Sequence, residues 1–94
     1  MRNDKENKII GLTFKFSVAV IEYCAQLESD RKYVVARQLL KSATSIGANA
    51  REAQNAESKA DFIHKFKVAA KEADETEYWL QLCQESKNIQ IQLS

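Results

Sequence analysis

Few side chains in this sequence have the types and spacing that catalysis or metal binding requires. The 94 residues include one histidine, His64, and two cysteines, Cys24 and Cys83. The cysteines lie far apart without a CxxC pair, which argues against a structural zinc site and a disulfide framework. Asp61 lies one helical turn before His64, a spacing typical of a surface pair rather than of a metal site. We therefore expect no metal ion, and two reduced thiols in the core.

Patterns for catalysis are equally sparse. The sequence has no nucleophile paired with a base and no glycine-rich phosphate loop. Glu72 and Glu75 have the three-residue spacing of a di-iron bundle motif, but that motif requires a histidine at the second position. The sequence thus predicts a protein that is not an enzyme, with no cofactor and no small-molecule substrate.

Basic side chains are the groups with the clearest binding chemistry. Lysines and arginines that repeat along helices can follow the phosphates of a nucleic acid. A formal net charge of +1 excludes a uniformly basic chain, so such a surface would need the stripes of several copies side by side. The alternative is that these charges are solvated helix faces. The candidate nucleic-acid-binding residues are Arg37, Lys41, Arg51, Lys65 and Lys67.

The elements that position these residues are predicted to be helices. The chain has no proline and only two glycines, so helical periodicity is its dominant signal. We expect an all-α fold, a single helical-bundle domain over residues 1–94. Helices are predicted over about 12–28, 31–56 and 58–87, with 1–11 as a flexible N-terminal segment and 88–94 as a frayed or extended tail.

Side-chain oxygens mark two of the predicted helix starts. Ser29 and Asp30 are N-cap candidates for the second helix, because a short side-chain oxygen there accepts from free backbone N–H groups. Ser58 and Asp61 resemble a capping box at the start of the third helix.

Apolar spacing predicts how the helices pack. The first helix has two stripes, which predicts burial on two sides; they are Phe16, Val20, Tyr23 and Leu27, and Phe14, Val18, Ile21 and Ala25. The third has a heptad seam of Phe62, Phe66, Ala69, Ala73, Thr76, Leu80 and Cys83. Gly47 lies between Ala43 and Ala50, which predicts a close contact with another helix rather than a kink.

Charge differs between the second and third predicted helices. Residues 31–56 hold five basic residues and one acid, whereas residues 57–85 hold four lysines and seven acids. The acids of the third helix gather in its later half, against the helix dipole. In an antiparallel hairpin, the basic start of the second helix would lie beside these acids and offset their unfavourable interaction with the helix dipole. We expect Arg37 or Lys41 to pair with Glu72, Glu75 or Glu77.

Neither a secretion signal nor a membrane span is expected. Residues 1–8 are charged and lack an apolar core, and the longest aliphatic run is only residues 18–21. These features predict a cytoplasmic protein with no membrane partner.

Residues 45–80, SIGANAREAQNAESKADFIHKFKVAAKEADETEYWL, carry a resemblance to a known family. Together with QLLKSATSIGAN from residue 38, they resemble the four-helix-bundle family encoded in 23S rRNA intervening sequences. The resemblance implies a left-handed antiparallel bundle that assembles as a homopentamer and has no enzymatic activity. A related branch, the accessory protein of diversity-generating retroelements, binds nucleic acid beside a reverse transcriptase.

The chain departs from the family pattern at its end. The family continues into a fourth helix after Gln92, where this sequence has only Leu93 and Ser94. We expect an up-and-down bundle of three long helices with the fourth missing or truncated, because the gene is shortened or the sequence is a fragment. Self-association would then cover the apolar surface. Two functions stay open: an oligomer that binds rRNA or another nucleic acid, and a purely structural self-assembling bundle or protein-interaction module.

Overall fold

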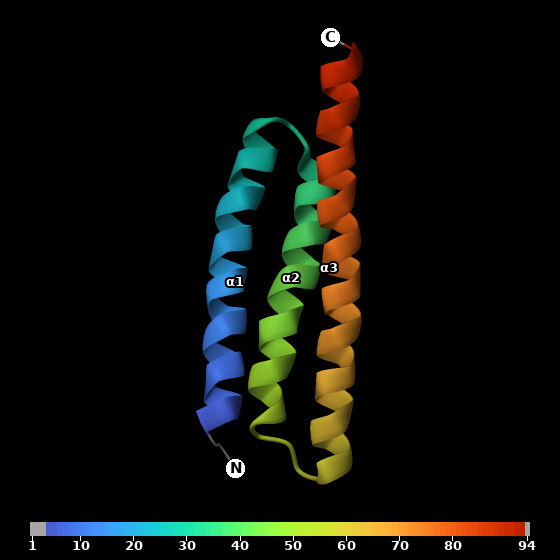
Figure 1. Ribbon diagram of the computed structural model, residues 1–94. Coiled ribbons are helices and arrows are strands. Elements are labelled where there is room, and N and C mark those ends of the chain that lie inside the picture. The colour runs from blue at the N-terminus through green and yellow to red at the C-terminus, as the bar shows by residue number, and fades with distance from the viewer. Residues whose placement is uncertain (1–3, 94) are drawn as a thin grey trace.

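The computed structural model describes the backbone of residues 4–93 and the side chains of residues 8–86. It consists over this range of the helices α1 (Asp4–Ser29), α2 (Tyr33–Ala53) and α3 (Lys59–Leu93), which run up, down and up (Figure 1). The predicted all-α, antiparallel up-and-down architecture is confirmed. No fourth helix lies within the described range.

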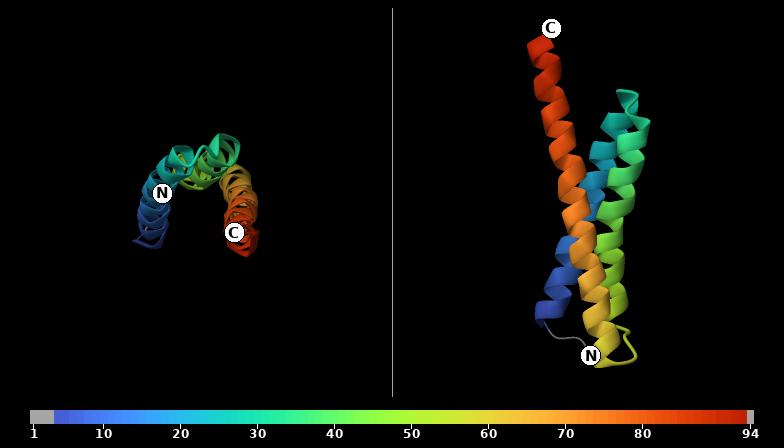
Figure 2. Two further views of the ribbon diagram at one scale, coloured as in Figure 1. Left: turned by 90° about the horizontal axis from the view of Figure 1, so that it is seen from above. Right: turned by 90° about the vertical axis from the view of Figure 1, so that its right-hand side faces the viewer.

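Helix α2 lies between its two neighbours. Both α1 and α3 pack on it, while no Cα atom of α1 comes within 8 Å of one in α3. Seen from above, the three helices follow an open curve with α2 in the middle (Figure 2). The result is an elongated, single layer of helices, 54 × 20 × 19 Å, whose outer two helices each have a long side that no other element covers.

The core lies near the end where α1 turns into α2. Its buried members are Val20, Cys24 and Leu27 from α1, Ala36, Leu39 and Ala43 from α2, and Cys83 from α3. The small alanines of α2 allow α1 and α3 to approach it closely. Leu39, with no exposed surface, therefore contributes the full value of a buried leucine, about 1.5–3 kcal/mol.

A buried hydroxyl pair joins α2 to α3. The single hydroxyl proton of Thr76 is shared between Ser42 Oγ at 2.9 Å and the carbonyl of Glu72 at 2.8 Å, and Ser42 Oγ donates to the carbonyl of Leu39 at 3.3 Å. Both side chains are buried, so each satisfies a polar group that water cannot reach.

The heptad seam of α3 is buried or half-buried at six of its positions. Ala69, Thr76 and Cys83 are buried, while Phe62, Phe66 and Leu80 are half-buried. Ala73 is exposed, so the expectation that it faces the core is wrong in the single chain. The seam faces α2 alone, and one partner helix does not cover its whole width.

A Schellman motif closes α1. The N–H of Lys32 donates to the carbonyl of Leu27 at 2.8 Å and that of Arg31 to Glu28 at 2.9 Å, with Arg31 at a φ of 64°. The N-cap of α2 is Lys32, with no side-chain capping bond. The expected caps Ser29 and Asp30 are therefore wrong, because these residues complete the end of α1 instead.

The Ser58 cap predicted for α3 forms, while the return bond from Asp61 reaches Glu57, one residue before the N-cap. Ser58 Oγ accepts from the N–H of Asp61 at 3.1 Å, and Asp61 Oδ2 accepts from the N–H of Glu57 at 3.3 Å. These bonds satisfy backbone donors at the start of the helix. Helix α2 ends at Ala53, three residues before the predicted end.

The outer helices extend further than predicted. Helix α1 begins at Asp4, so residues 4–11 are helical rather than a flexible segment. Gly11 lies inside α1, since an isolated glycine in a helix interior costs only about 1 kcal/mol and does not end the helix. Helix α3 continues to Leu93, so the tail is helical rather than extended up to that residue.

Candidate functional site

An apolar stripe on α1 has no cover within the chain. Phe14, Val18 and Ile21 are 56%, 41% and 51% exposed, and Ala25 continues the stripe as an exposed residue. In the other stripe of α1, Val20 and Leu27 are buried and Tyr23 is half-buried, whereas Phe16 is 37% exposed. Burial on two sides is therefore wrong for the single chain, because α1 contacts only α2 and α2 occupies one of its sides.

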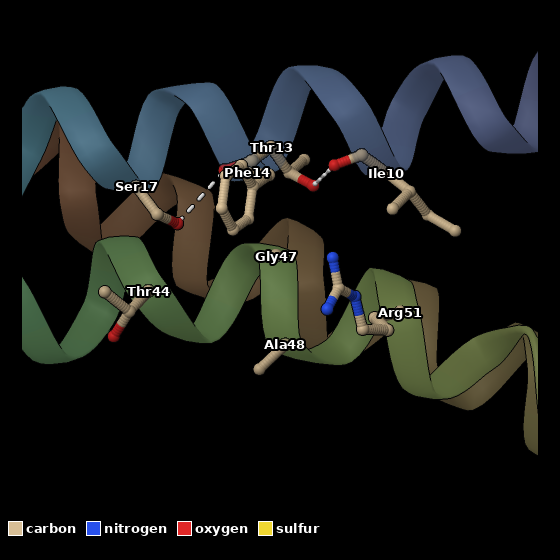
Figure 3. A pocket seen from close by; sticks show the side chains of 8 residues that line it. All are labelled: Ile10, Thr13, Phe14, Ser17, Thr44, Gly47, Ala48 and Arg51. Atoms are coloured by element: carbon tan, nitrogen blue, oxygen red, sulfur yellow. Dashed lines mark hydrogen bonds between the residues drawn. The ribbon is translucent and has the colours of Figure 1, made fainter.

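A cavity of about 280 Å³ lies between α1 and α2, beside this stripe (Figure 3). Its walls are Ile10, Thr13, Phe14 and Ser17 from α1 and Thr44, Gly47, Ala48 and Arg51 from α2. The hydroxyl groups of the lining turn back to their own helices: Thr13 donates to Ile9 at 2.9 Å, Ser17 to Thr13 at 3.0 Å and Thr44 to Leu40 at 2.8 Å. The cavity thus offers apolar surface and one cationic group, the guanidinium of Arg51.

Gly47 forms the floor of this cavity. A Cβ atom at this position would lie 3.4 Å from both the carbonyl oxygen and Oγ1 of Thr13, which is van der Waals contact. The neighbouring small residues Ala43 and Ala50 are buried. The predicted close contact with another helix is confirmed, and α1 is that helix.

Arg51 is held at the cavity by an aromatic ring. Its Cζ atom lies 5.9 Å from the ring centroid of Phe14, within the range of a cation–π interaction. Phe14 also belongs to the exposed stripe, so Arg51 joins the stripe to the basic flank of α2.

Arg37 lies on the flank of α2 that faces away from α3, whereas Lys41 lies within about 20° of Glu52, the residue through which α2 pairs with Lys65 of α3. Arg37, Thr44 and Arg51 follow at seven-residue spacing, and the last two line the cavity with α1. Neither Arg37 nor Lys41 forms an ion pair with any residue whose side chain is described. The predicted pairs with Glu72, Glu75 or Glu77 are therefore wrong; Arg37 projects from the other side of α2, and Lys41 is exposed without an acidic partner among the described side chains.

The two lysines predicted on α3 behave differently from each other. Lys65 Nζ lies 2.9 Å from Oε1 of Glu52, and the hydrogen bond and charge of Glu52 raise the pKa of Lys65. Lys67 is exposed and points about 200° around the helix from Lys65. The five candidate residues therefore do not form one surface in a single chain: Arg37 and Arg51 share a flank of α2, Lys41 lies about 80° around α2 from Arg51, Lys65 is neutralised, and Lys67 lies on another face.

A second exposed surface on α3 combines apolar and acidic side chains. Tyr78 and Leu82, one turn apart, are 55% and 40% exposed. Asp74, Glu75 and Glu85 border them on the same side of the helix, all exposed and without an ion pair among residues 8–86. Sequence reasoning missed this face because it treated the acids as partners of α2; the four-residue spacing of Tyr78 and Leu82 among acids was the available signal.

The cysteines are buried free thiols, as expected. Cys24 donates to the carbonyl of Ala36 at 3.4 Å, and burial raises the pKa of its thiol, which disfavours the reactive thiolate. Cys83 lies on α3, whose Cα atoms all stay more than 8 Å from those of α1. A disulfide between them would need backbone movement. Burial, and next the nearby Cys83, also raise the pKa of Tyr23.

Two further properties bear on function. Within the described residues, no group of three or more histidine, cysteine, aspartate or glutamate side chains is placed to hold a metal ion. Residues 8–29 are long and apolar enough to cross a membrane, judged by length and composition alone, with a mean hydropathy of 1.3. Lys15 and Glu22, seven residues apart, interrupt that segment with charge on one side of the helix.

Comparison with known proteins identifies relatives of most of the chain. A solved protein of unknown function from Bacteroides thetaiotaomicron, described as a member of the S23 ribosomal protein family, superimposes with a TM-score of 0.85 and 44% sequence identity. The match covers 89% of this chain and 76% of that one. No curated protein matches the chain. The family model for the 23S rRNA-intervening sequence protein matches residues 5–93, and the chain belongs to this family.

Proposed function

We propose that this chain is a non-enzymatic protein that self-associates and whose assembly binds RNA through repeated cations of α2. The proposal rests on the exposed stripe of Phe14, Val18 and Ile21 on α1, together with the exposed, unpaired Arg37 and Lys41 on the neighbouring α2. The stripe supports self-association, and the cations of α2 support RNA binding by the assembly.

Self-association is favoured by the size of the uncovered apolar surface. Complete burial of a Val, Ile or Phe side chain stabilises by about 1.5–3 kcal/mol, and the three stripe residues each retain roughly half of that surface for a partner. Small domains also have thin cores and gain stability from association. The family resemblance makes a ring of five copies the expected assembly, here as part of the proposal.

RNA is the proposed nucleic acid because the family description names 23S rRNA. Arg37 and Lys41 are exposed and free of ion pairs within the described part of the chain. Two cations per copy bind a phosphate backbone weakly, but repetition around an assembly raises the effective concentration of the remaining sites. Of the other candidates, Arg51 interacts with the ring of Phe14 and Lys65 forms an ion pair with Glu52, so we expect both to contribute less to RNA binding.

Two alternatives compete with this proposal: a purely structural role and a membrane location. A purely structural bundle would assemble equally well without RNA, and it is distinguished by the experiment below. A membrane-spanning α1 would place Lys15 and Glu22 in hydrocarbon, where charged side chains are costly. An amphipathic helix within a cytoplasmic assembly agrees better with this charge distribution. The proposal also includes no catalysis, because the sequence has a single histidine and no glycine-rich phosphate loop.

The test is a titration of a labelled 23S rRNA fragment with the purified protein at several salt concentrations. We expect saturable binding that weakens steeply between about 50 and about 200 mM salt, as phosphate contacts require. The Arg37→Ala/Lys41→Ala variant should bind more weakly, and Lys65→Ala, which loses a cation already neutralised by Glu52, should bind as the wild type. No binding by the assembled wild type would leave the structural bundle as the function.

A further inference from the structure

We infer that the RNA bound by α2 is unpaired, and that one of its bases stacks on the ring of Tyr33 while Arg37 and Lys41 hold neighbouring phosphates. These three residues form the outer row of α2. The inference rests on the RNA binding proposed above, and it specifies the class of RNA and the side chain that recognises it.

The outer row follows one side of α2. Its members are four residues apart, so each lies about 6 Å further along the helix and about 40° further around it than the one before. All three side chains are exposed. Arg37, in the middle, lies about 80° around the helix from Gly47, which contacts α1, and about 140° from Ser42, which bonds α3. The row therefore lies on a side of α2 that neither neighbouring helix covers.

Tyr33 presents an uncovered aromatic ring at the start of this row. Its side chain is 55% exposed, and among residues 8–86 its ring contacts no other aromatic ring and no cation. Proteins bind single-stranded nucleic acids by stacking the bases on exposed aromatic rings of this kind. Tyr33 thus has the chemistry and the exposure that one stacked base requires.

The charge around the ring favours a phosphate backbone. Residues 31–51 contain five basic residues and no acid. The two cations of the outer row form no ion pair with a described side chain, so both can bind phosphates. The acids that flank this segment are Asp30, which is followed directly by two bases, and Glu52, which is paired with Lys65. A strand whose base stacks on Tyr33 would therefore place its next phosphates among cations alone.

The ring of Tyr33 distinguishes unpaired from paired RNA. In a duplex each base is already stacked on its neighbours, whereas an unpaired strand exposes the faces of its bases to aromatic side chains. Such stacking tolerates any base, because every base has a π-face. Cations alone favour the duplex, whose phosphates release more counterions for each contact than those of a single strand. A preference for the single strand would therefore come from Tyr33 and not from the cations.

Tyr78 on α3 provides a matched comparison within the chain. It is also 55% exposed, but its ring contacts that of Trp79, with 5.3 Å between the centroids. Asp74 and Glu75, about one turn before it, separate it from Lys71 along the same side of the helix, and their carboxylates repel phosphate. Tyr78 thus has the same exposure as Tyr33 without a cation in the adjacent turn.

Affinities for an unstructured single-stranded RNA and for the same strand annealed to its complement test the inference. We expect the wild type to bind the single strand more tightly. Tyr33→Ala should weaken single-strand binding by about 5- to 150-fold, the range for loss of one base stack, and should leave duplex binding and the salt slope unchanged. Tyr33→Phe, which keeps the ring, and the control Tyr78→Ala should bind as the wild type. Circular dichroism checks folding, and Tyr33→Gln replaces Tyr33→Ala if that variant is unfolded.

Two results overturn base stacking while RNA binding stands: equal affinity of the wild type for both RNAs, and an unchanged single-strand affinity in Tyr33→Ala. A loss in Tyr33→Ala that is equal on the duplex and the single strand, or that Tyr33→Phe shares, also overturns it, because the ring face would then not be the group that binds. A wild type that binds neither RNA overturns the proposed function as well.

Discussion

Lys65 on α3 lies 2.9 Å from Glu52 on α2, and this is the one ion pair among the residues whose side chains are described. It joins the two helices near their connection, far along α2 from Arg37 and Lys41. The electrostatic link between α2 and α3 thus uses a base from the acidic helix and an acid from the basic helix, the reverse of the pairing expected from the charge totals.

Lys65→Met should lower the stability of the fold slightly at neutral pH. Glu52 raises the pKa of Lys65, so the stabilisation is complete below the pKa of the unfolded lysine and disappears as pH rises through the higher folded value. Urea unfolding of the wild type and the variant should therefore differ at neutral pH and converge at strongly alkaline pH. Glu52→Gln should behave like Lys65→Met, and a difference that grows with pH would contradict this interpretation.

Arg31→Gly should stabilise the protein by about 1 kcal/mol. Arg31 has a φ of 64° at the C′ position of the Schellman motif, where glycine avoids the steric cost of a Cβ atom. Thermal or chemical unfolding measures the gain. Asp30→Gly is the control and should give no gain, since Asp30 has no positive φ. An Arg31→Gly variant less stable than the wild type would show that the interactions of the arginine side chain stabilise the fold by more than the positive φ destabilises it.

The buried hydroxyl pair should show energetic coupling. Thr76→Val removes the donor to Ser42 and is expected to destabilise the fold by about 1–3 kcal/mol, because Ser42 loses a partner in a site without water. Ser42→Ala/Thr76→Val should cost less than the sum of the single variants. Denaturant unfolding of all four proteins gives the coupling, and strict additivity would mean that the hydrogen bond contributes nothing.

RNA binding should depend on salt through Arg37 and Lys41. Each phosphate contact contributes about 0.7–0.9 to the slope of log affinity against log salt. Arg37→Ala/Lys41→Ala should reduce both the affinity and this slope, whereas Lys67→Ala, on another face, should change them less. An unchanged slope in the double variant would remove the α2 flank from the binding surface.

Much of the fold follows from local sequence patterns. The heptad seam apart from the exposed Ala73, the small residues around Gly47 and the Ser58 cap each depend on neighbours within a few turns, and each predicted the observed structure. The ends of the helices were harder to predict. Gly11 and Asp30 are residue types that often mark the ends of helices. Helix α1 nevertheless continues through Gly11, and Asp30 belongs to the end of α1 rather than to the start of α2.

The candidate surfaces depended on information that the sequence lacks. Whether Arg37 faces α3 or α1 is set by the rotation of α2 between its two neighbours, and totals of charge do not specify that rotation. The second stripe of α1 was recognised as apolar, but only the structure shows that it is uncovered. Tyr78 and Leu82 can be identified as an exposed surface only once the side of α3 that contacts α2 is known.

Sedimentation equilibrium of the unmodified protein at micromolar concentrations tests the central claim most directly. Self-association through the exposed stripe of α1 predicts a mass that is a defined multiple of 10.7 kDa and that falls in the Val18→Glu variant. The family resemblance predicts five copies. A stable 10.7 kDa monomer under these conditions would contradict the account, because neither the stripe nor the cations of α2 would then act in a repeated surface.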